Sequence, residues 1–109
     1  MIRLPFPPSL LSGHSKGSHW PKTKATKQWR EWARIATMEA APAVPDEGDI
    51  IIRVRFVPPD RRSDRTNFAN RMKPIFDGIA DALHVNDRRF LPAYEYAEPE
   101  APGRVEIVL

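Results

Sequence analysis

Acidic and basic side chains crowd one short stretch, residues 58–67, which reads Pro-Pro-Asp-Arg-Arg-Ser-Asp-Arg-Thr-Asn. The stretch lies between a predicted strand and a predicted helix, where folding alone does not require so many charges. Hard divalent cations such as Mg²⁺ bind carboxylate oxygens, and guanidinium groups bind phosphate. The stretch therefore has the residue types needed to hold both a metal ion and a phosphodiester.

Two aspartates, Asp64 and Asp87, are the acids that we predict to bind such an ion. Magnesium held by carboxylates can activate a water and stabilise charge on the phosphorus and the leaving oxygen. Asp64 precedes a predicted helix and Asp87 follows it, and a straight helix of about 18 residues separates its ends by about 25 Å. The two aspartates can therefore share an ion only if the helix is folded back or shorter, or if two subunits meet there.

Each of these residues also has a purely structural interpretation. Asp64 can cap the N-terminus of the helix that follows it. Asp87, in the dipeptide Asn86-Asp87, can be a turn residue. Lys73 and Asp77 are four residues apart and can form an ion pair on a helix surface, although this order is the less stabilising one.

Composition favours a polyanionic partner. The chain of 109 residues has 17 Lys and Arg against 14 Asp and Glu, and no Cys, which excludes disulfides, thiolate zinc sites and thiol nucleophiles. Its basic residues gather in two segments, which favours nucleic acid over a membrane surface. We find no signal peptide and no run of about 20 apolar residues, so we expect a cytoplasmic protein without membrane contact.

The hydrophobic pattern predicts a single α+β domain over residues 1–109, in the order β-α-β-α-β-β, with a mixed sheet packed against helices. Pro5 should place the first strand at a sheet edge. Pro74 lies inside the second helix, and because the apolar stripe stays in phase across it we expect a kink there. The expected elements are a strand at 2–6, a helix from Thr23 or Thr26 to about Ala41, a strand at 49–57, a helix at 67–84 and a closing pair of strands at 90–96 and 104–109.

The same pattern predicts which aromatic side chains are buried. Trp29 and Trp32 recur with alanines at helical spacing and are expected in the core. Trp20, in a predicted loop over residues 10–21, is as plausible a base contact as a loop residue. In the strand at 49–57 the core positions are Ile50, Ile52, Val54 and Phe56.

Four segments resemble the RusA-like Holliday junction resolvase family over nearly the whole chain. Residues 4–9 (Leu-Pro-Phe-Pro-Pro-Ser) resemble the family's opening strand and turn. Residues 59–62 followed by residues 64–67 (Asp-Arg-Thr-Asn) resemble its central motif, an arginine run before Asp-x-Asp-Asn. Residues 77–83 and 85–87 resemble the end of its helix and its second acidic cluster.

This resemblance implies a homodimeric endodeoxyribonuclease that cuts four-way DNA junctions by Mg²⁺-dependent phosphodiester hydrolysis in recombination and repair, with Mn²⁺ as a possible substitute. By position it implies that Asp64 and Asp87 bind the metal and, with Lys73, catalyse hydrolysis. The partner is then branched DNA. The residues expected to contact it are Arg61, Arg62, Arg65, Arg71, Asn67, Lys16, Lys22 and Lys24.

The sequence departs from the family motif at two positions. Thr66 stands where the family has its second motif aspartate, and Asn86 where a paired aspartate is common. A hydroxyl or an amide binds Mg²⁺ more weakly than a carboxylate does, so we expect weaker metal binding or help from Asp60 or Asp77.

Aligning the family motif on Lys73 and Asp77 instead places Asn67 and Ala69 at its two acid positions, which fits the motif less well.

These departures leave a second hypothesis open, a protein that binds DNA junctions with the same fold but does not cut them. A third hypothesis, a structural module that binds no nucleic acid, explains the core but not the placement of the charges.

Overall fold

The computed structural model describes residues 1–12 and 19–109, and the side chains of residues 19–21 lie outside this description. Four strands and two α-helices follow one another in the predicted β-α-β-α-β-β order. They are β1 (Ile2–Pro5), α1 (His19–Ala40), β2 (Ile50–Val57), α2 (Lys73–Leu83), β3 (Phe90–Tyr96) and β4 (Arg104–Val108). Short 3-10 helices lie between them at η1 (Ser9–Leu11), η2 (Arg65–Arg71) and η3 (Asp87–Arg89).

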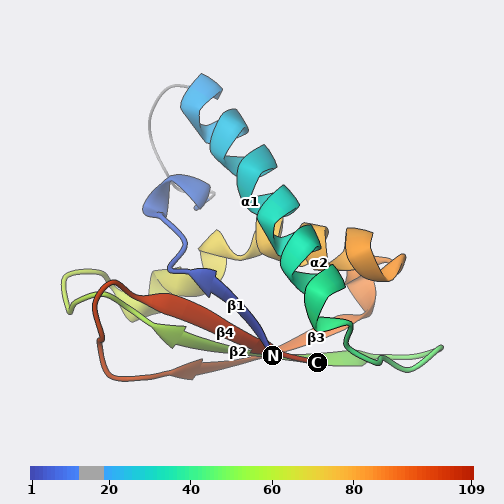
Figure 1. The fold of residues 1–109 in the computed structure, drawn as a ribbon. Helices are drawn as coiled ribbons and strands as arrows, with labels where there is room; N and C mark the ends of the chain where they lie inside the picture. Colours follow the sequence, from blue (N-terminus) through green and yellow to red (C-terminus); the bar gives the residue numbers. More distant parts are fainter. Residues whose placement is uncertain (13–18) are drawn as a thin grey trace.

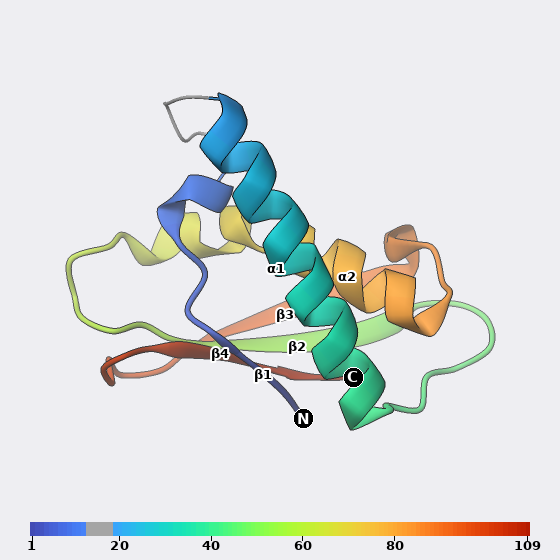
Figure 2. The same cartoon turned by 45° about the horizontal axis from the view of Figure 1, so that its top comes forward.

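The strands form one mixed sheet in the order β1-β4-β2-β3. Both α-helices lie on the same side of it, and α1 crosses over the sheet (Figures 1 and 2). β1 is an edge strand, as Pro5 predicts. The structure is thus a small α+β domain of the expected class, with both of its described α-helices on one face of the sheet.

The expected closing pair of strands is wrong, because β3 and β4 flank β2 on opposite sides. β3 pairs with β2 in parallel and β4 pairs with β2 antiparallel. The segment from η2 to η3, which contains α2, connects β2 to β3 as a crossover, and such a connection gives parallel pairing. The loop after β3 then carries the chain past the end of β2 to its other side.

The core lies between the helices and the inward side chains of the sheet. Ile50, Ile52, Val54 and Phe56 are all buried, as predicted. Trp29 is buried too, but Trp32 is 40% exposed, so its predicted place in the core is wrong. Trp32 packs edge-on against the ring of Trp29, with the centroids 5.2 Å apart, and lies beside the buried stripe of α1 rather than within it.

The predicted kinked helix at 67–84 is two separate elements, so the kink is wrong. η2 ends at Arg71, and α2 begins at Lys73 with Pro74 in its first turn. A proline is tolerated in the first turn of a helix because the N–H it lacks would have no helical acceptor there. α2 has 11 residues, which makes it much shorter than the predicted helix.

The first α-helix begins at His19, before the predicted caps Thr23 and Thr26, and ends at Ala40 close to the predicted end. The predicted loop over residues 10–21 therefore gives way to helix from His19 onward, and residues 13–18 lie outside the described part of the chain. Within residues 1–12 and 19–109, none of the helices has the length and apolar character needed to cross a bilayer.

The two α-helices approach closely at Gly78. A β-carbon at this position would lie 2.1 Å from the carbonyl oxygen of Arg30 and 2.8 Å from Cβ of Ala33, both in α1. One turn further along α2, Asp81 accepts two hydrogen bonds from Arg30, at 2.7 Å from Nε and 2.9 Å from Nη2. A small residue and a two-point ion pair thus hold α1 on α2.

We expect the Arg30–Asp81 pair to make stability sensitive to acid. The hydrogen bonds from Arg30 lower the pKa of Asp81 below its usual value. A carboxyl of this kind contributes stability that is complete above its unfolded pKa, near 4, and is lost as the pH falls through the lower folded pKa. The Asp81→Asn variant should therefore lose less stability than the wild type between about pH 4 and pH 2 in urea denaturation. Equal losses would contradict this role.

Candidate functional site

Lys73, Asp77 and Asp87 converge on one side of α2. The Nζ atom of Lys73 lies 3.0 Å from Oδ1 of Asp77, one helical turn further on. The same amine donates a hydrogen bond to Oδ2 of Asp87, which is 14 residues away in the sequence. One lysine therefore connects two carboxylates from different elements.

The turn after α2 brings Asp87 to Lys73. His84 ends the helix in the left-handed conformation, with φ 55° and ψ 42°, which reverses the chain. η3 begins at Asp87, and the side chain of Asn86 caps it by accepting a hydrogen bond of 3.0 Å from the N–H of Arg88. Asn86, which departs from the family motif, therefore has a structural role next to the cluster.

The contacts within the cluster shift the pKa values of Lys73 and Asp87. The hydrogen bond from Lys73 is the main cause of the lowered pKa of Asp87. Asp87 first and Asp77 second raise the pKa of Lys73. With one positive and two negative charges, the cluster retains a net negative charge.

A cleft of about 370 Å³ opens beside this cluster, between α1, α2, η1 and η2. Lys22 and Lys73 both line it, so a residue predicted to contact DNA and a residue predicted to catalyse hydrolysis share one cavity. The Nζ atom of Lys22 also donates to the carbonyl oxygen of Ser12 at 3.0 Å. The cleft is lined by Leu11, Lys22, Thr26, Asn70, Lys73, Pro74 and Asp77.

Asp64 has local partners instead. Its Oδ1 accepts hydrogen bonds from the N–H of Thr66 at 3.1 Å and from its hydroxyl at 2.8 Å, and it caps η2. These two hydrogen bonds lower the pKa of Asp64. The capping interpretation is confirmed, and the carboxylate that shares Lys73 with Asp87 is Asp77 rather than Asp64.

A conservative substitution separates capping from metal binding at Asp64. Asparagine caps as well as aspartate does, so Asp64→Asn should unfold at the wild-type temperature, whereas Asp64→Ala should unfold at a lower one. Neither substitution should change the affinity for Mn²⁺, measured by calorimetry. Weaker Mn²⁺ binding by Asp64→Asn at unchanged thermal stability would restore Asp64 as a ligand.

The donor atoms suit a hard cation only in part. Among residues 1–12 and 19–109, no three or more His, Cys, Asp or Glu side chains gather as a metal site. Asp77 and Asp87 offer two carboxylates, and Asn70, whose side chain carries an amide, also lines the cleft. Magnesium is commonly bound through one or two carboxylates together with waters and phosphate oxygens. The donor types therefore fit Mg²⁺ at Asp77 and Asp87, where Lys73 now neutralises part of the charge.

Residues 58–67 form a charged turn after β2, and its arginines are accessible to a large anion. Arg61, Arg62 and Arg65 are all exposed. Arg61 forms an ion pair with Glu98, in the loop after β3. Asp60 accepts a hydrogen bond of 2.9 Å from the N–H of Arg62, so it too has a local partner.

The predicted contact of Arg71 with DNA is wrong, because Arg71 is only 8% exposed. Its Nη1 donates to the carbonyl oxygen of Pro7 at 3.0 Å. Its guanidinium lies 5.6 Å from the ring centroid of Phe6 and 5.3 Å from that of Phe68. Burial lowers its pKa. Arg71 therefore holds η2 against the segment after β1 and has little surface left for DNA.

The remaining predicted contacts lie on different elements. Asn67 is exposed on η2 and Lys24 is exposed on α1. Lys22 is half-buried. Lys16 and the side chain of Trp20 lie outside the described residues. The sequence pattern missed Asn70 and Thr26, and it gave Asp77 only a supporting role, although the unfavourable Lys-to-Asp order at 73 and 77 was a signal for function.

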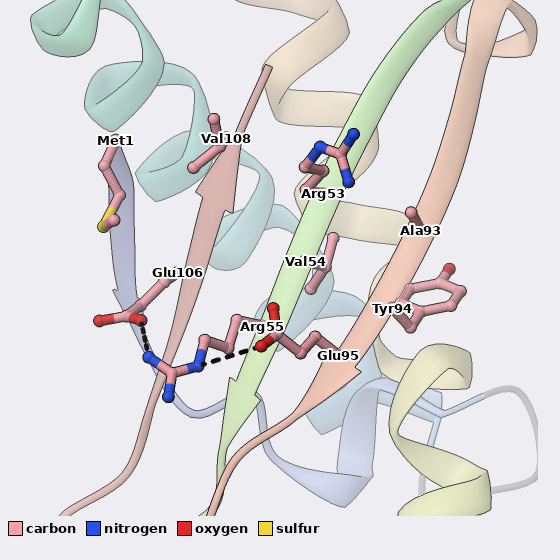
Figure 3. Close-up of a pocket in the computed structure, with 9 residues that line it drawn as sticks. All are labelled: Met1, Arg53, Val54, Arg55, Ala93, Tyr94, Glu95, Glu106 and Val108. Atoms are coloured by element: carbon pink, nitrogen blue, oxygen red, sulfur yellow. Dashed lines mark hydrogen bonds and ion pairs between the residues drawn. The ribbon is translucent and has the colours of Figure 1, made fainter.

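A second hollow, of about 440 Å³, lies on the face of the sheet opposite α1 and α2 (Figure 3). Arg55 lies across it, 3.2 Å from Glu106 and 3.9 Å from Glu95. The hollow shares no lining residue with the cleft beside Lys73. Both acids that line it, Glu95 and Glu106, already pair with Arg55, and they are too few to form a metal-binding group of three.

No family model matches the chain. A protein of Xylella fastidiosa (strain Temecula1 / ATCC 700964), described as an uncharacterized protein, is 39% identical over 113 residues. The match covers 99% of this chain and 72% of the relative. The chain belongs to the family of this Xylella protein. Because the relative's description names no activity, membership of the family adds no chemistry to that of the site.

Proposed function

We propose that this protein is a RusA-like endodeoxyribonuclease that binds branched DNA, including four-way junctions, and hydrolyses a phosphodiester there with Mg²⁺ or Mn²⁺. The observation that carries the proposal is the convergence of Lys73, Asp77 and Asp87 beside a cleft. A surface ion pair needs only one acid, and exposed pairs add little stability. A lysine between two carboxylates beside a cleft is better explained by chemistry on an anionic substrate.

In this proposal Asp77 and Asp87 hold the metal, replacing the predicted pair Asp64 and Asp87. The bound ion supplies an activated water and stabilises charge on phosphate oxygens. Lys73 donates a hydrogen bond to the scissile phosphate, and Lys22 neutralises a neighbouring phosphate across the cleft. The exposed arginines Arg61 and Arg65 hold the DNA backbone.

The resemblance to RusA-like resolvases also leads us to propose a homodimer in the cytoplasm, acting in recombination and repair. Two copies of the cleft would cut two strands of one junction. Sedimentation of the purified chain would measure this state directly, and a monomer at all concentrations would contradict the symmetric part of the proposal.

A second candidate function, junction binding without cleavage, is favoured by one observation. The ammonium of Lys73 already contacts both carboxylates, while the hydroxyl of Thr66 donates to the capping carboxylate of Asp64. If these contacts persist when DNA is bound, no metal enters. Binding would then depend steeply on salt and no strand would be cut.

Cleavage of a labelled four-way junction separates the two candidates. We expect strand cutting with Mg²⁺, and a loss of at least about 100-fold in Asp87→Asn, the size of effect seen when a charge-stabilising group is removed. Asp46→Asn, an exposed change in the connector before β2, is the matched control and should cut normally. Equal cutting by Asp87→Asn would overturn the nuclease.

Binding without cutting by the wild type would support the second candidate. Thr66→Asp would then test whether the missing motif acid is the defect, since restored cutting would identify it. Failure to bind any DNA at low salt would remove both candidates.

A further inference from the structure

Tyr94 and Tyr96 of β3 hold their rings against the buried ring of Phe56. They are the register partners of Val54 and Phe56 in β2, so they lie on the side of the sheet that faces the helices. The ring of Phe56 stacks on both, with centroids 5.7 and 5.6 Å away and planes inclined by 23° and 25°. Tyr96 also lies 6.3 Å from Phe68 of η2. The orientation of both rings is therefore set by the core.

Both rings nevertheless keep an open surface. Tyr94 is 36% exposed and Tyr96 is 43% exposed. β3 is the edge strand beside β2, and within the described sheet no strand lies beyond it. Figure 3 shows the ring of Tyr94 on the outer side of β3, away from Arg55. Each ring thus keeps exposed surface on which another flat group can stack.

The spacing of the two rings suits successive bases. Residues two apart on one strand lie about 7 Å from each other along the chain. Each ring therefore has room for its own base. Aromatic side chains that present a free face are a common way of binding unpaired nucleotides, because every base has a π-face.

The charged turn lies next to these rings. The N–H of Ala97 donates to the carbonyl oxygen of Phe56 at 2.9 Å, and the N–H of Glu100 donates to that of Pro58 at 2.8 Å. The segment after Tyr96 thus runs beside the end of β2 and the residues that follow it. Arg61 meets this segment through its ion pair with Glu98. Exposed cations and exposed rings therefore occupy the same end of the molecule.

We propose that Tyr94 and Tyr96 form a stacking surface for unpaired bases of branched DNA, with the neighbouring arginines on the phosphates of the same strand. This inference rests on the proposed function, because it takes DNA as the ligand. It adds where the nucleotides that leave the duplex are held. Exposed rings and arginines together match an unpaired strand better than a duplex, whose bases are already stacked on one another.

Replacement of each ring tests the stacking surface. Tyr94→Leu and Tyr96→Leu should each weaken binding of single-stranded oligothymidine by about 5- to 150-fold, the range found for loss of one base–aromatic stack. Tyr94→Phe and Tyr96→Phe keep the ring and should bind like the wild type. Trp32→Leu removes an exposed aromatic ring from α1 and is the matched control. Wild-type binding by both leucine variants would overturn the inference.

A change in the DNA tests the same stacking surface without altering the protein. Branched DNA with an unpaired flap should bind more weakly when the flap nucleotides next to the branch are made abasic, which keeps every phosphate and removes the bases. A 2-aminopurine at that place should lose fluorescence on binding to the wild type and keep it with Tyr94→Leu. Unchanged affinity of the abasic flap would overturn the stacking surface.

The outcomes for the two proposals differ. If the abasic and leucine experiments show no effect while junction DNA still binds, only the stacking surface is wrong. If neither junction DNA nor oligothymidine binds at low salt, the proposed function is wrong as well.

Discussion

Gly78→Ala should destabilise the fold by about 3 kcal/mol or more, at the upper end of the range for overpacked sites. The added β-carbon would lie 2.1 Å from the carbonyl oxygen of Arg30, which is backbone and cannot rotate away. Alanine is the better helix former by about 1 kcal/mol, but this gain is smaller than the cost of moving α1 away from α2. The midpoint of urea denaturation should therefore fall sharply.

Gly48→Ala is the matched control for this change. Gly48 has nothing within 4 Å of its added β-carbon, but its φ of 81° is unfavourable for alanine. Its cost should therefore be about 1–2 kcal/mol, from backbone conformation alone. If Gly78→Ala lowered the free energy of unfolding less than Gly48→Ala does, α1 and α2 would be able to move apart at little cost, and the predicted clash would be wrong.

Local patterns in the sequence predicted most of the elements. The alternation at Ile50 to Phe56 predicted β2 and its buried face, and Pro5 predicted an edge strand, because both depend only on neighbouring residues. The order of the four strands in the sheet depends on contacts between distant segments. β4 pairs with β2 on the side opposite β3 and so lies inside the sheet, between β1 and β2. No residue of the final segment reveals this position by itself.

Pro74 and Arg71 show where a local sequence pattern predicts the wrong structure. The apolar stripe at 68–83 stays in phase because η2 and α2 both pack on the same core, with Phe68 and Ile75 fully buried. Continuity of the stripe therefore does not require one helix. Its charge predicts that Arg71 is exposed, whereas its guanidinium packs against the rings of Phe6 and Phe68.

The candidate site was half predicted. The resemblance predicts Lys73 and Asp87 as site residues, and the structure brings them into contact. Their partner Asp77 is predicted mainly as a surface partner of Lys73, because the motif places its first acid at Asp64. The left-handed turn at His84 returns the chain along the short helix α2 and brings Asp87 to Lys73.

Lys73→Met should have the largest effect on the proposed chemistry. The variant loses the amine that would stabilise charge on the scissile phosphate, so junction cleavage should fall by about 100- to 1,000-fold. Methionine keeps most of the length and the apolar stem of lysine, so the fold should be retained. Lys27→Met, an exposed change on α1 at a residue with no proposed role, is the control and should cut like the wild type.

The same variant should bind divalent metal more tightly, although it cuts less. The ammonium of Lys73 now lies between Asp77 and Asp87, and a metal ion must displace it to bind there. Without this competitor the two like charges repel, which raises the pKa of Asp87 from its lowered value and favours a divalent cation. Calorimetry with Mn²⁺ should show the higher affinity, and a titration should show Asp87 taking up its proton at a higher pH. Weaker Mn²⁺ binding in Lys73→Met would mean that the carboxylates hold the lysine for structure alone, and the site would then lose its claim to a metal.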